Sequence, residues 1–243
     1  MESMAKQQAN PDPEPEFDEF AEDYDAALDK GLALSGEGKD YFAEGRMRWL
    51  ARRLEELGKS SPQAALDFGC GTGSATPFFF SHLPIKALLG TDPSEKSLEI
   101  ARQTWKTYAV EFRIPEVDDS VDAFDLAFCN GVFHHIVPEE RAAALAQIFR
   151  SLKPGGLFAF WENNPWNPVT RYAMSRVPFD ADAILVWPHE ARKLLRAAGF
   201  QILKTDYQFF FPRSLAALRI LESSLAWLPV GGQYLVLARK PER

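Results

Sequence analysis

Three glycines with a spacing of two follow a short apolar stretch in the segment LDFGCGTG, at positions Gly69, Gly71 and Gly73. Glycine adopts positive φ and lets a ligand approach the backbone, so this spacing is typical of a loop that binds a nucleotide or nucleoside. Asp67 precedes the first glycine by two positions, and Asp92 ends the next apolar stretch. A carboxylate in the second position accepts hydrogen bonds from ribose hydroxyls and repels a 2′-phosphate. We therefore expect a nucleoside ligand without that phosphate.

A dinucleotide-dependent dehydrogenase is the competing interpretation of this loop. Its fingerprint GxGxxG/A needs a third small residue five positions after the first glycine. That position holds Ser74 when counted from Gly69 and Thr76 when counted from Gly71. The fingerprint therefore fails in both registers.

A second group of residues offers proton chemistry. His134 and His135 follow an apolar stretch that ends at Asn130, and Glu162 ends the next one. Histidine titrates near neutral pH and is suited to take a proton from a reacting hydroxyl. Neighbouring residues of a helical turn point about 100° apart, so one histidine faces the acceptor, and we favour His135 over His134. Two alternatives stay open: both histidines only form hydrogen bonds with loop backbone, and Glu162 only orients a neighbour or a substrate hydroxyl.

Composition and charge limit the function classes. The formal charge is −7, and the 27 basic residues are scattered, which argues against a nucleic-acid partner. No apolar run approaches the ~18 residues of a membrane span, and no secretory signal is visible, so we expect a cytoplasmic protein without a membrane partner. The two cysteines, Cys70 and Cys129, make neither a disulfide framework nor a metal-ligand spacing. We expect free thiols and no metal.

Short apolar stretches alternate with amphipathic segments from residue 60 onward, which predicts a parallel sheet with helices on both faces. The expected strands are 64–69, 86–92, 110–114, 124–130 and 156–162, with two more near 202–210 and 232–239. The expected helices are 39–58, 138–152 and 189–200, with another marked by leucines between 215 and 228.

The chain length and the 46% hydrophobic content predict one domain over 17–243. Residues 1–16 hold three prolines and little to bury, so we expect a disordered tail. Within the domain, 17–58 form N-terminal cap helices, and 163–188 and 209–231 are insertions on the substrate side.

Four motifs in this order resemble those of the class I S-adenosylmethionine-dependent methyltransferases. They are LDFGCGTG (66–73), GTDPSEKSLEIAR (90–102), FDLAFCNGVFHHI (124–136) and LKPGGLFAF (152–160). The resemblance extends from about Phe17 to Arg239. It implies an α/β fold with a Rossmann-like, seven-stranded, mostly parallel sheet, helices on both faces and an antiparallel last strand.

The resemblance also implies S-adenosyl-L-methionine as cofactor and assigns residues to it. Gly69, Cys70 and Gly71 lie along its methionine part, Asp92 holds the ribose, Pro93 packs on the adenine, and the Asn130 carbonyl meets the ammonium group. Asp67 is a further cofactor-binding residue. From the N-terminal segment, Tyr24 and Arg46 contact the cofactor, and Arg46 binds the cofactor carboxylate. An arginine on a solvated helix face is the alternative for Arg46.

One motif departs from the family pattern. The family has an aspartate after the third strand that meets the adenine amino group, and here Ile114 and Pro115 stand in its place. We assign Pro115 to the adenine side. Glu116, Asp118 or Asp119 are alternative partners of the amino group, unless these acids only solvate a loop.

The segment ENNPWNPVTRY (162–172) is expected to roof the acceptor pocket. Its NNPW differs from the NPPY-type motif of DNA and amide N-methyltransferases, which follows the fourth strand, where this chain has NGVF. Aromatic and amide side chains suit a flat or hydroxylated ring by stacking and hydrogen bonding; here they are Trp161, Asn163, Asn164, Trp166 and Arg171.

The sequence thus predicts methyl transfer to a small-molecule acceptor, at a hydroxyl group of a hydroxylated or ring-containing metabolite. The alternative function is a non-catalytic sensor or scaffold that binds S-adenosylmethionine. The sequence does not indicate an oligomeric state.

Overall fold

The computed structural model describes residues 31–115, 121–180 and 183–242. The expected tail 1–16, the rest of the segment up to residue 30 with Tyr24, and the candidate adenine partners Glu116, Asp118 and Asp119 lie outside the described residues.

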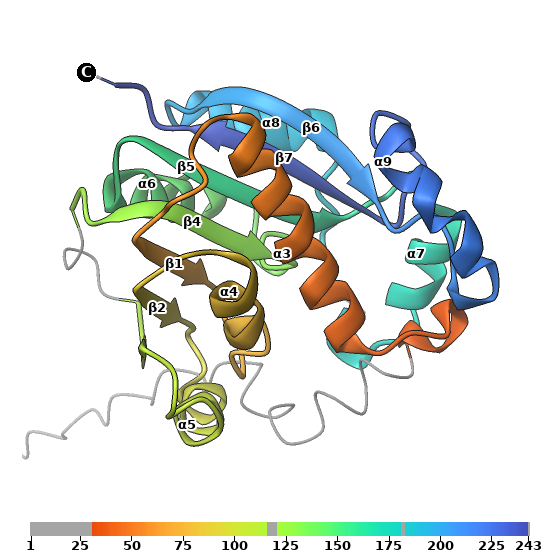
Figure 1. The fold of residues 1–243 in the computed structure, drawn as a ribbon, viewed down its shortest axis with the longest axis horizontal. Helices are drawn as coiled ribbons and strands as arrows, with labels where there is room; N and C mark the ends of the chain where they lie inside the picture. The colour runs from red at the N-terminus through yellow and green to blue at the C-terminus, as the bar shows by residue number, and fades with distance from the viewer. Residues whose placement is uncertain (1–30, 116–120, 181–182, 243) are drawn as a thin grey trace, which may run out of the picture.

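The described chain forms one seven-stranded sheet with the order β3-β2-β1-β4-β5-β7-β6 (Figure 1). The strands are β1 (Ala64–Phe68), β2 (Ala87–Thr91), β3 (Val110–Arg113), β4 (Phe124–Asn130), β5 (Leu152–Asn163), β6 (Gln201–Gln208) and β7 (Gln233–Arg239). The pairs among β1 to β5 are parallel, and β7 runs antiparallel to both β5 and β6. This arrangement confirms the predicted fold class, including the antiparallel last strand.

Helices cover both faces of the sheet, as Figure 1 shows. The α-helices are α3 (Lys39–Glu56), α4 (Thr76–His82), α5 (Glu95–Thr104), α6 (Arg141–Ser151), α7 (Pro168–Met174), α8 (Pro188–Ala197) and α9 (Glu222–Leu225). The 3-10 helices are η1 (Ala33–Ser35), η2 (Pro178–Asp180) and η3 (Arg213–Leu221). One core cluster joins α3 and α4 to the sheet, and a second joins α6 and α8 to the opposite face. None of the described helices combines the length and the apolar character needed to cross a bilayer.

Side chains of β5 alternate between these two clusters, as a strand covered on both faces requires. Phe158 and Phe160 belong to the α6 side, whereas Leu157 and Trp161 belong to the α3 side. Trp161 is fully buried. The expectation that Trp161 contacts the acceptor is therefore wrong, because its ring is part of the core.

Two elements differ from the sequence prediction. β5 begins at Leu152, which pairs with Phe124, and residues 153–156 form an irregularity before Leu157 pairs with Leu126. The helix expected between 215 and 228 is instead η3 followed by the short α9, with non-helical backbone at Leu215. Large apolar side chains of η3 are exposed. A regular helix has no sheet face to pack on there.

Candidate active site

The carboxyl ends of β1, β2, β4 and β5 lie along one edge of the sheet because these strands are parallel. In open α/β sheets, ligands bind at this edge, where the strand order reverses. Here the order reverses between β1 and β4. The cofactor-binding and catalytic residues predicted from the sequence within the described residues, except Arg46, lie at the carboxyl ends of these strands or in the loops after these strands and β3.

The glycine loop after β1 takes the left-handed backbone that the sequence predicted. Gly69, Gly71 and Gly73 have φ values of 73°, 53° and 72°. The amides of Gly69 and Cys70 donate to the Thr91 carbonyl of β2, at 2.8 and 3.0 Å. The loop is therefore fixed by the neighbouring strand rather than by its own side chains.

The three glycines differ in what a side chain would meet. A Cβ on Gly69 would lie 2.3 Å from Val132 Cγ2, and one on Gly73 would lie 2.9 Å from Trp105 and from Phe112. At Gly71, among the described residues other than its chain neighbours, no atom lies within 4 Å of that position. Gly69 and Gly73 are thus needed for packing, whereas Gly71 faces open space that a ligand can occupy.

Asp92 closes this loop at the end of β2. Its Oδ2 accepts the Gly71 amide at 2.8 Å and its Oδ1 accepts the Ser94 amide at 2.9 Å. A carboxylate has about four acceptor positions, so it retains capacity for ribose hydroxyls. The adjacent Pro93 is exposed, and Pro115 is half-buried after β3.

Asp67 and Arg46 lie on the α3 side of the sheet. Burial raises the pKa of Asp67 to about 7, and the negative charge of Asp92 adds to this, while Arg46 opposes it. Arg46 is buried, and its Nη1 donates to Gln233 Oε1 at 2.9 Å. Arg46 therefore does not lie on a solvated helix face, which was the alternative interpretation.

Asn130 and Cys70 complete the cofactor side. Asn130 Oδ1 is buried and has no hydrogen-bond partner among the described residues. Both cysteines are buried free thiols, and burial raises the pKa of Cys70 well above its usual value. Open space at Gly71 and the carboxylate of Asp92 fit a nucleoside, and the orphaned Asn130 Oδ1 offers an acceptor to a ligand N–H group. The predicted contact of the Asn130 backbone carbonyl with the ammonium group stays a prediction.

On the acceptor side, Glu162 holds His134. The Nδ1 of His134 lies 2.6 Å from Glu162 Oε2, and the amides of Phe133 and His134 donate to Glu162 Oε1 at 2.9 and 3.3 Å. Glu162 is 1% exposed and His134 is 3% exposed. Glu162 therefore orients a neighbour, which was one of the two roles left open for it.

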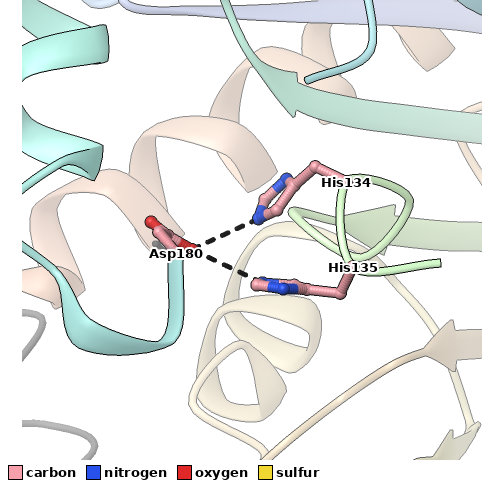
Figure 2. A group of neighbouring side chains, drawn as sticks. All are labelled: His134, His135 and Asp180. Carbon is pink, nitrogen blue, oxygen red and sulfur yellow. Dashed lines mark ion pairs between the residues drawn. The ribbon is translucent and has the colours of Figure 1, made fainter. Parts of the chain in front are cut away.

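Asp180 completes this group and was not predicted from the sequence. Its Oδ1 lies 3.4 Å from Nε2 of His134 and 3.4 Å from Nε2 of His135 (Figure 2). It belongs to η2, far along the chain from the histidines, and follows a loop without any motif. Only its place inside the predicted insertion 163–188 pointed toward the site.

Burial and the neighbouring charges shift the pKa values of the two histidines in opposite directions. Burial lowers the pKa of His134, but the Glu162 and Asp180 carboxylates outweigh it and raise the pKa to about 10. Burial lowers the pKa of His135 to about 4, and the neighbouring His134 adds to this effect. The side chain of His135 is 18% exposed, so it is the more accessible of the two.

Backbone hydrogen bonds place the segment after η2 against the histidine loop. The Ile184 amide donates to the His134 carbonyl at 2.8 Å. Arg141, which is buried, donates through Nε to the Ile136 carbonyl and through Nη2 to the Ile184 carbonyl. These contacts join two loops that are distant in sequence.

The asparagines of the segment 162–172 hold the two insertions together. Asn164 Nδ2 donates to the carbonyls of Pro229 and Gly231, and Asn167 Nδ2 donates to that of Val230. Asn164 is fully buried, so its predicted contact with the acceptor is wrong. Its side chain is used to bind the backbone of the second insertion.

Trp166 lies differently from Trp161. It is 43% exposed, and its ring lies 6.1 Å from Trp187 and 6.2 Å from Tyr207. Arg171 is exposed and Asn163 is half-buried. A role for Trp166, Asn163 and Arg171 in binding the acceptor stays a prediction.

The sheet order, the glycine loop and the carboxylate at the end of β2 have the arrangement of the class I methyltransferase fold, whose members use S-adenosylmethionine as methyl donor. Residues 66–158, less than half of the chain, match the family model described as "Methyltransferase domain". This segment is therefore similar to the domain of that family.

Relatives and solved structures agree with this class. Trans-aconitate 2-methyltransferase of Methylobacterium nodulans is 32% identical over 118 residues, which are 49% of this chain and 45% of the relative. Malonyl-[acyl-carrier protein] O-methyltransferase of Halalkalibacterium halodurans is 28% identical over 52% of this chain and 50% of the relative. The chain therefore spans about half the length of these relatives.

A SAM-dependent methyltransferase of Thermotoga maritima shares the fold over a longer range. Its crystal structure has a TM-score of 0.63 and 20% identity, and the match covers 92% of this chain and 97% of that one. At this identity the similarity extends to the fold alone.

Proposed function

We propose that this protein transfers the methyl group of S-adenosylmethionine to an oxygen atom of a small-molecule acceptor. One observation carries the proposal: the open glycine loop and the buried histidine group lie side by side, since Val132 of the histidine loop packs on Gly69. The first offers a nucleoside site and the second offers polar groups for an acceptor.

The cofactor site is proposed to use the residues predicted from the sequence. Asp92 accepts hydrogen bonds from the ribose hydroxyls, the peptide from Gly69 to Gly71 supports the methionine part, and Asn130 receives the ammonium group. Arg46 of α3 is proposed to bind the carboxylate of the cofactor. Bound there, S-adenosylmethionine supplies an electrophilic methyl group on a sulfonium.

The acceptor site is proposed to lie at the Nε2 atoms of the histidine pair. Methyl transfer is an in-line displacement, so the protein must fix the acceptor oxygen in line with the sulfur–methyl bond and keep water away. His135 is the accessible member of the pair, and His134 is held behind it by Glu162. Glu162 is a positioning residue in this scheme.

An oxygen acceptor in a small molecule is supported by the net charge and by the names of the relatives. The net charge is −7, which does not favour nucleic acid. The relatives named above carry trans-aconitate and malonyl-[acyl-carrier protein] in their names, and one is named an O-methyltransferase. The insertions 163–188 and 209–231 are proposed to roof the acceptor and set its identity, with a hydroxyl as the accepting group.

Binding and turnover test this proposal separately. Calorimetry with S-adenosylmethionine should give one site, and Asp92→Ala should weaken binding by at least ~1 kcal/mol, about fivefold, because hydrogen bonds to a charged acceptor are lost. Asp125→Ala is the matched control, because Asp125 accepts backbone amides at the opposite edge of the sheet. Equal loss in both variants would refute the assignment.

Turnover is measured with methyl-labelled cofactor and a library of hydroxylated and carboxylated metabolites. A labelled O-methyl product is the expected result. Tight cofactor binding without transfer to any acceptor would contradict an enzyme and favour the sensor or scaffold.

A further inference from the structure

Three donor atoms of the histidine group converge on one point. They are Nε2 of His134, Nε2 of His135 and Oδ1 of Asp180, and all lie within 4.8 Å of one another. Figure 2 shows both imidazole rings, which belong to the loop after β4, turned toward the carboxylate of Asp180 in η2. Donors from two separate segments therefore face one gap.

The distances match metal coordination better than hydrogen bonding. Both N···O separations are 3.4 Å, beyond the 2.7–3.2 Å range of N–H···O bonds. Tetrahedral zinc with bonds of about 2.0–2.1 Å places neighbouring ligand atoms about 3.3–3.4 Å apart. The two nitrogen–carboxylate separations thus fit a tetrahedral ion, and the two imidazole nitrogens lie within 4.8 Å of each other.

An unsatisfied atom points to the same gap. His134 is 3% exposed, and among the described residues its Nε2 has no hydrogen-bond partner. A buried ring nitrogen without a partner is costly in a folded protein. A bound ion would satisfy it, since neutral imidazole nitrogen is a common metal ligand.

The support behind His134 has the form found at metal sites. Metal-binding histidines usually donate their second ring N–H to a carboxylate, which fixes the tautomer and ring orientation. Here Glu162 Oε2 lies 2.6 Å from Nδ1, and backbone amides hold Glu162 in place. A metal ion that displaces the Nε2 proton would therefore meet the ring lone pair on the side of Asp180.

We propose that His134, His135 and Asp180 bind a divalent first-row transition-metal ion, with Zn²⁺ as the best match. Two imidazoles and one carboxylate suit borderline metals rather than Mg²⁺ or Ca²⁺, which prefer oxygen ligands. Three protein ligands with an open position are typical of catalytic rather than structural zinc. The proposal departs from the sequence-based expectation of no metal, which rested on cysteine spacing alone.

The role of the ion rests on the proposed function, although its binding does not. The open position would take the acceptor oxygen and favour loss of a hydroxyl proton. In the transfer, an oxygen–carbon bond forms as the sulfur–carbon bond breaks; the hydroxyl proton goes to solvent, and S-adenosylhomocysteine leaves. The acceptor class is then an oxygen donor able to ligate a metal.

Metal binding is tested without cofactor or acceptor. The full chain is treated with chelator and dialysed, then titrated with Zn²⁺ and, separately, Mg²⁺ by calorimetry, and with Co²⁺ by visible absorption. One Zn²⁺ per chain should bind, with Co²⁺ bands of a site with nitrogen ligands and with weaker Mg²⁺ binding.

Variants locate the site. Asp180→Asn and His135→Ala should each weaken Zn²⁺ binding at least tenfold, and Glu162→Gln should weaken it about 10–100-fold through His134. His82→Ala is the control, because His82 belongs to another part of the fold, the end of α4, where its Nε2 lies 3.3 Å from Glu44 Oε1. Unchanged affinity in Asp180→Asn and His135→Ala, or no saturable Zn²⁺ binding, would overturn the proposal.

A second measurement separates this proposal from the proposed function. Methyl transfer by the chelator-treated protein should fall and recover on addition of Zn²⁺. Full transfer without metal would overturn the metal's role and leave the methyltransferase intact. If the variants lose Zn²⁺ binding but the unmodified protein transfers methyl groups to no acceptor, the metal site is supported and the proposed enzyme activity is refuted.

Discussion

The two halves of the sheet's carboxyl edge are constructed in different ways. After β1 and β2, the side proposed for the cofactor consists of backbone with positive φ and of a carboxylate bonded to backbone amides. After β4 and β5, the side proposed for the acceptor consists of side chains from three separate segments, namely His134 and His135, Glu162, and Asp180. The first half depends on local conformation, and the second depends on long-range contacts between charged groups.

The largest effect is expected from removing a charge in the second half. Glu162→Ala leaves His134 Nδ1 and three backbone amides without their acceptor, so the free energy of unfolding should fall by about 3–5 kcal/mol. Urea denaturation measures this loss. Asp206→Ala, which breaks an equally buried pair with Arg53, should lose a similar amount without altering Zn²⁺ binding.

A loss below ~1 kcal/mol for Glu162→Ala would break the comparison, because the second half would then not depend on that carboxylate. Recovery of most of the stability in Glu162→Gln, which retains one acceptor oxygen, would sharpen it.

The second prediction concerns Asp67, the buried side chain of the first half. Burial raises its pKa to about 7 from the ordinary 3.8, so the folded protein retains the proton to a higher pH than the unfolded chain. The stability contributed by protonated Asp67 is complete below pH ~4 and is lost as the pH rises toward 7. The loss is on the order of 4 kcal/mol.

Asp67→Asn removes this dependence. The variant's free energy of unfolding, minus that of the unmodified protein without cofactor, should therefore rise between pH 4 and 7 and stay level above that range. Urea denaturation at several pH values measures the difference. A constant difference would contradict the pKa shift.

The smallest effects separate two glycines of the loop. Gly69→Ala combines positive φ with a clash against Val132 and should lower the free energy of unfolding by about 2–4 kcal/mol. Gly71→Ala has only the φ penalty, about 1–2 kcal/mol, but its methyl group occupies the space proposed for the cofactor.

Thermal unfolding and cofactor titration distinguish the two variants. Gly71→Ala should lose more cofactor affinity than stability, and Gly69→Ala should do the reverse. Identical profiles would mean that the loop does not distinguish packing from ligand contact.

The same contrast explains what the sequence could predict. The glycine loop, the strands and the acid at the end of β2 are local patterns, and they allowed the fold class to be predicted. Asp180 and Arg141 reach the site only because two loops meet in space, and no spacing in the sequence indicates that meeting. The asparagines were read as ligand contacts because amide groups serve both purposes, and only burial shows that Asn164 binds backbone.

The core sets another limit on prediction. Trp161 and Glu162 are neighbours on β5, so they point to opposite faces, and the sequence does not reveal which face meets the ligand edge. Glu162 reaches the histidine loop, whereas Trp161 packs under α3.

The Val132 side chain that fills the space beside Gly69 joins these two halves mechanically. The loop that would carry the methyl donor cannot shift without pushing on the loop that would receive the acceptor. The separation between the two reactants is thus set by a contact that neither of them makes, before either has arrived.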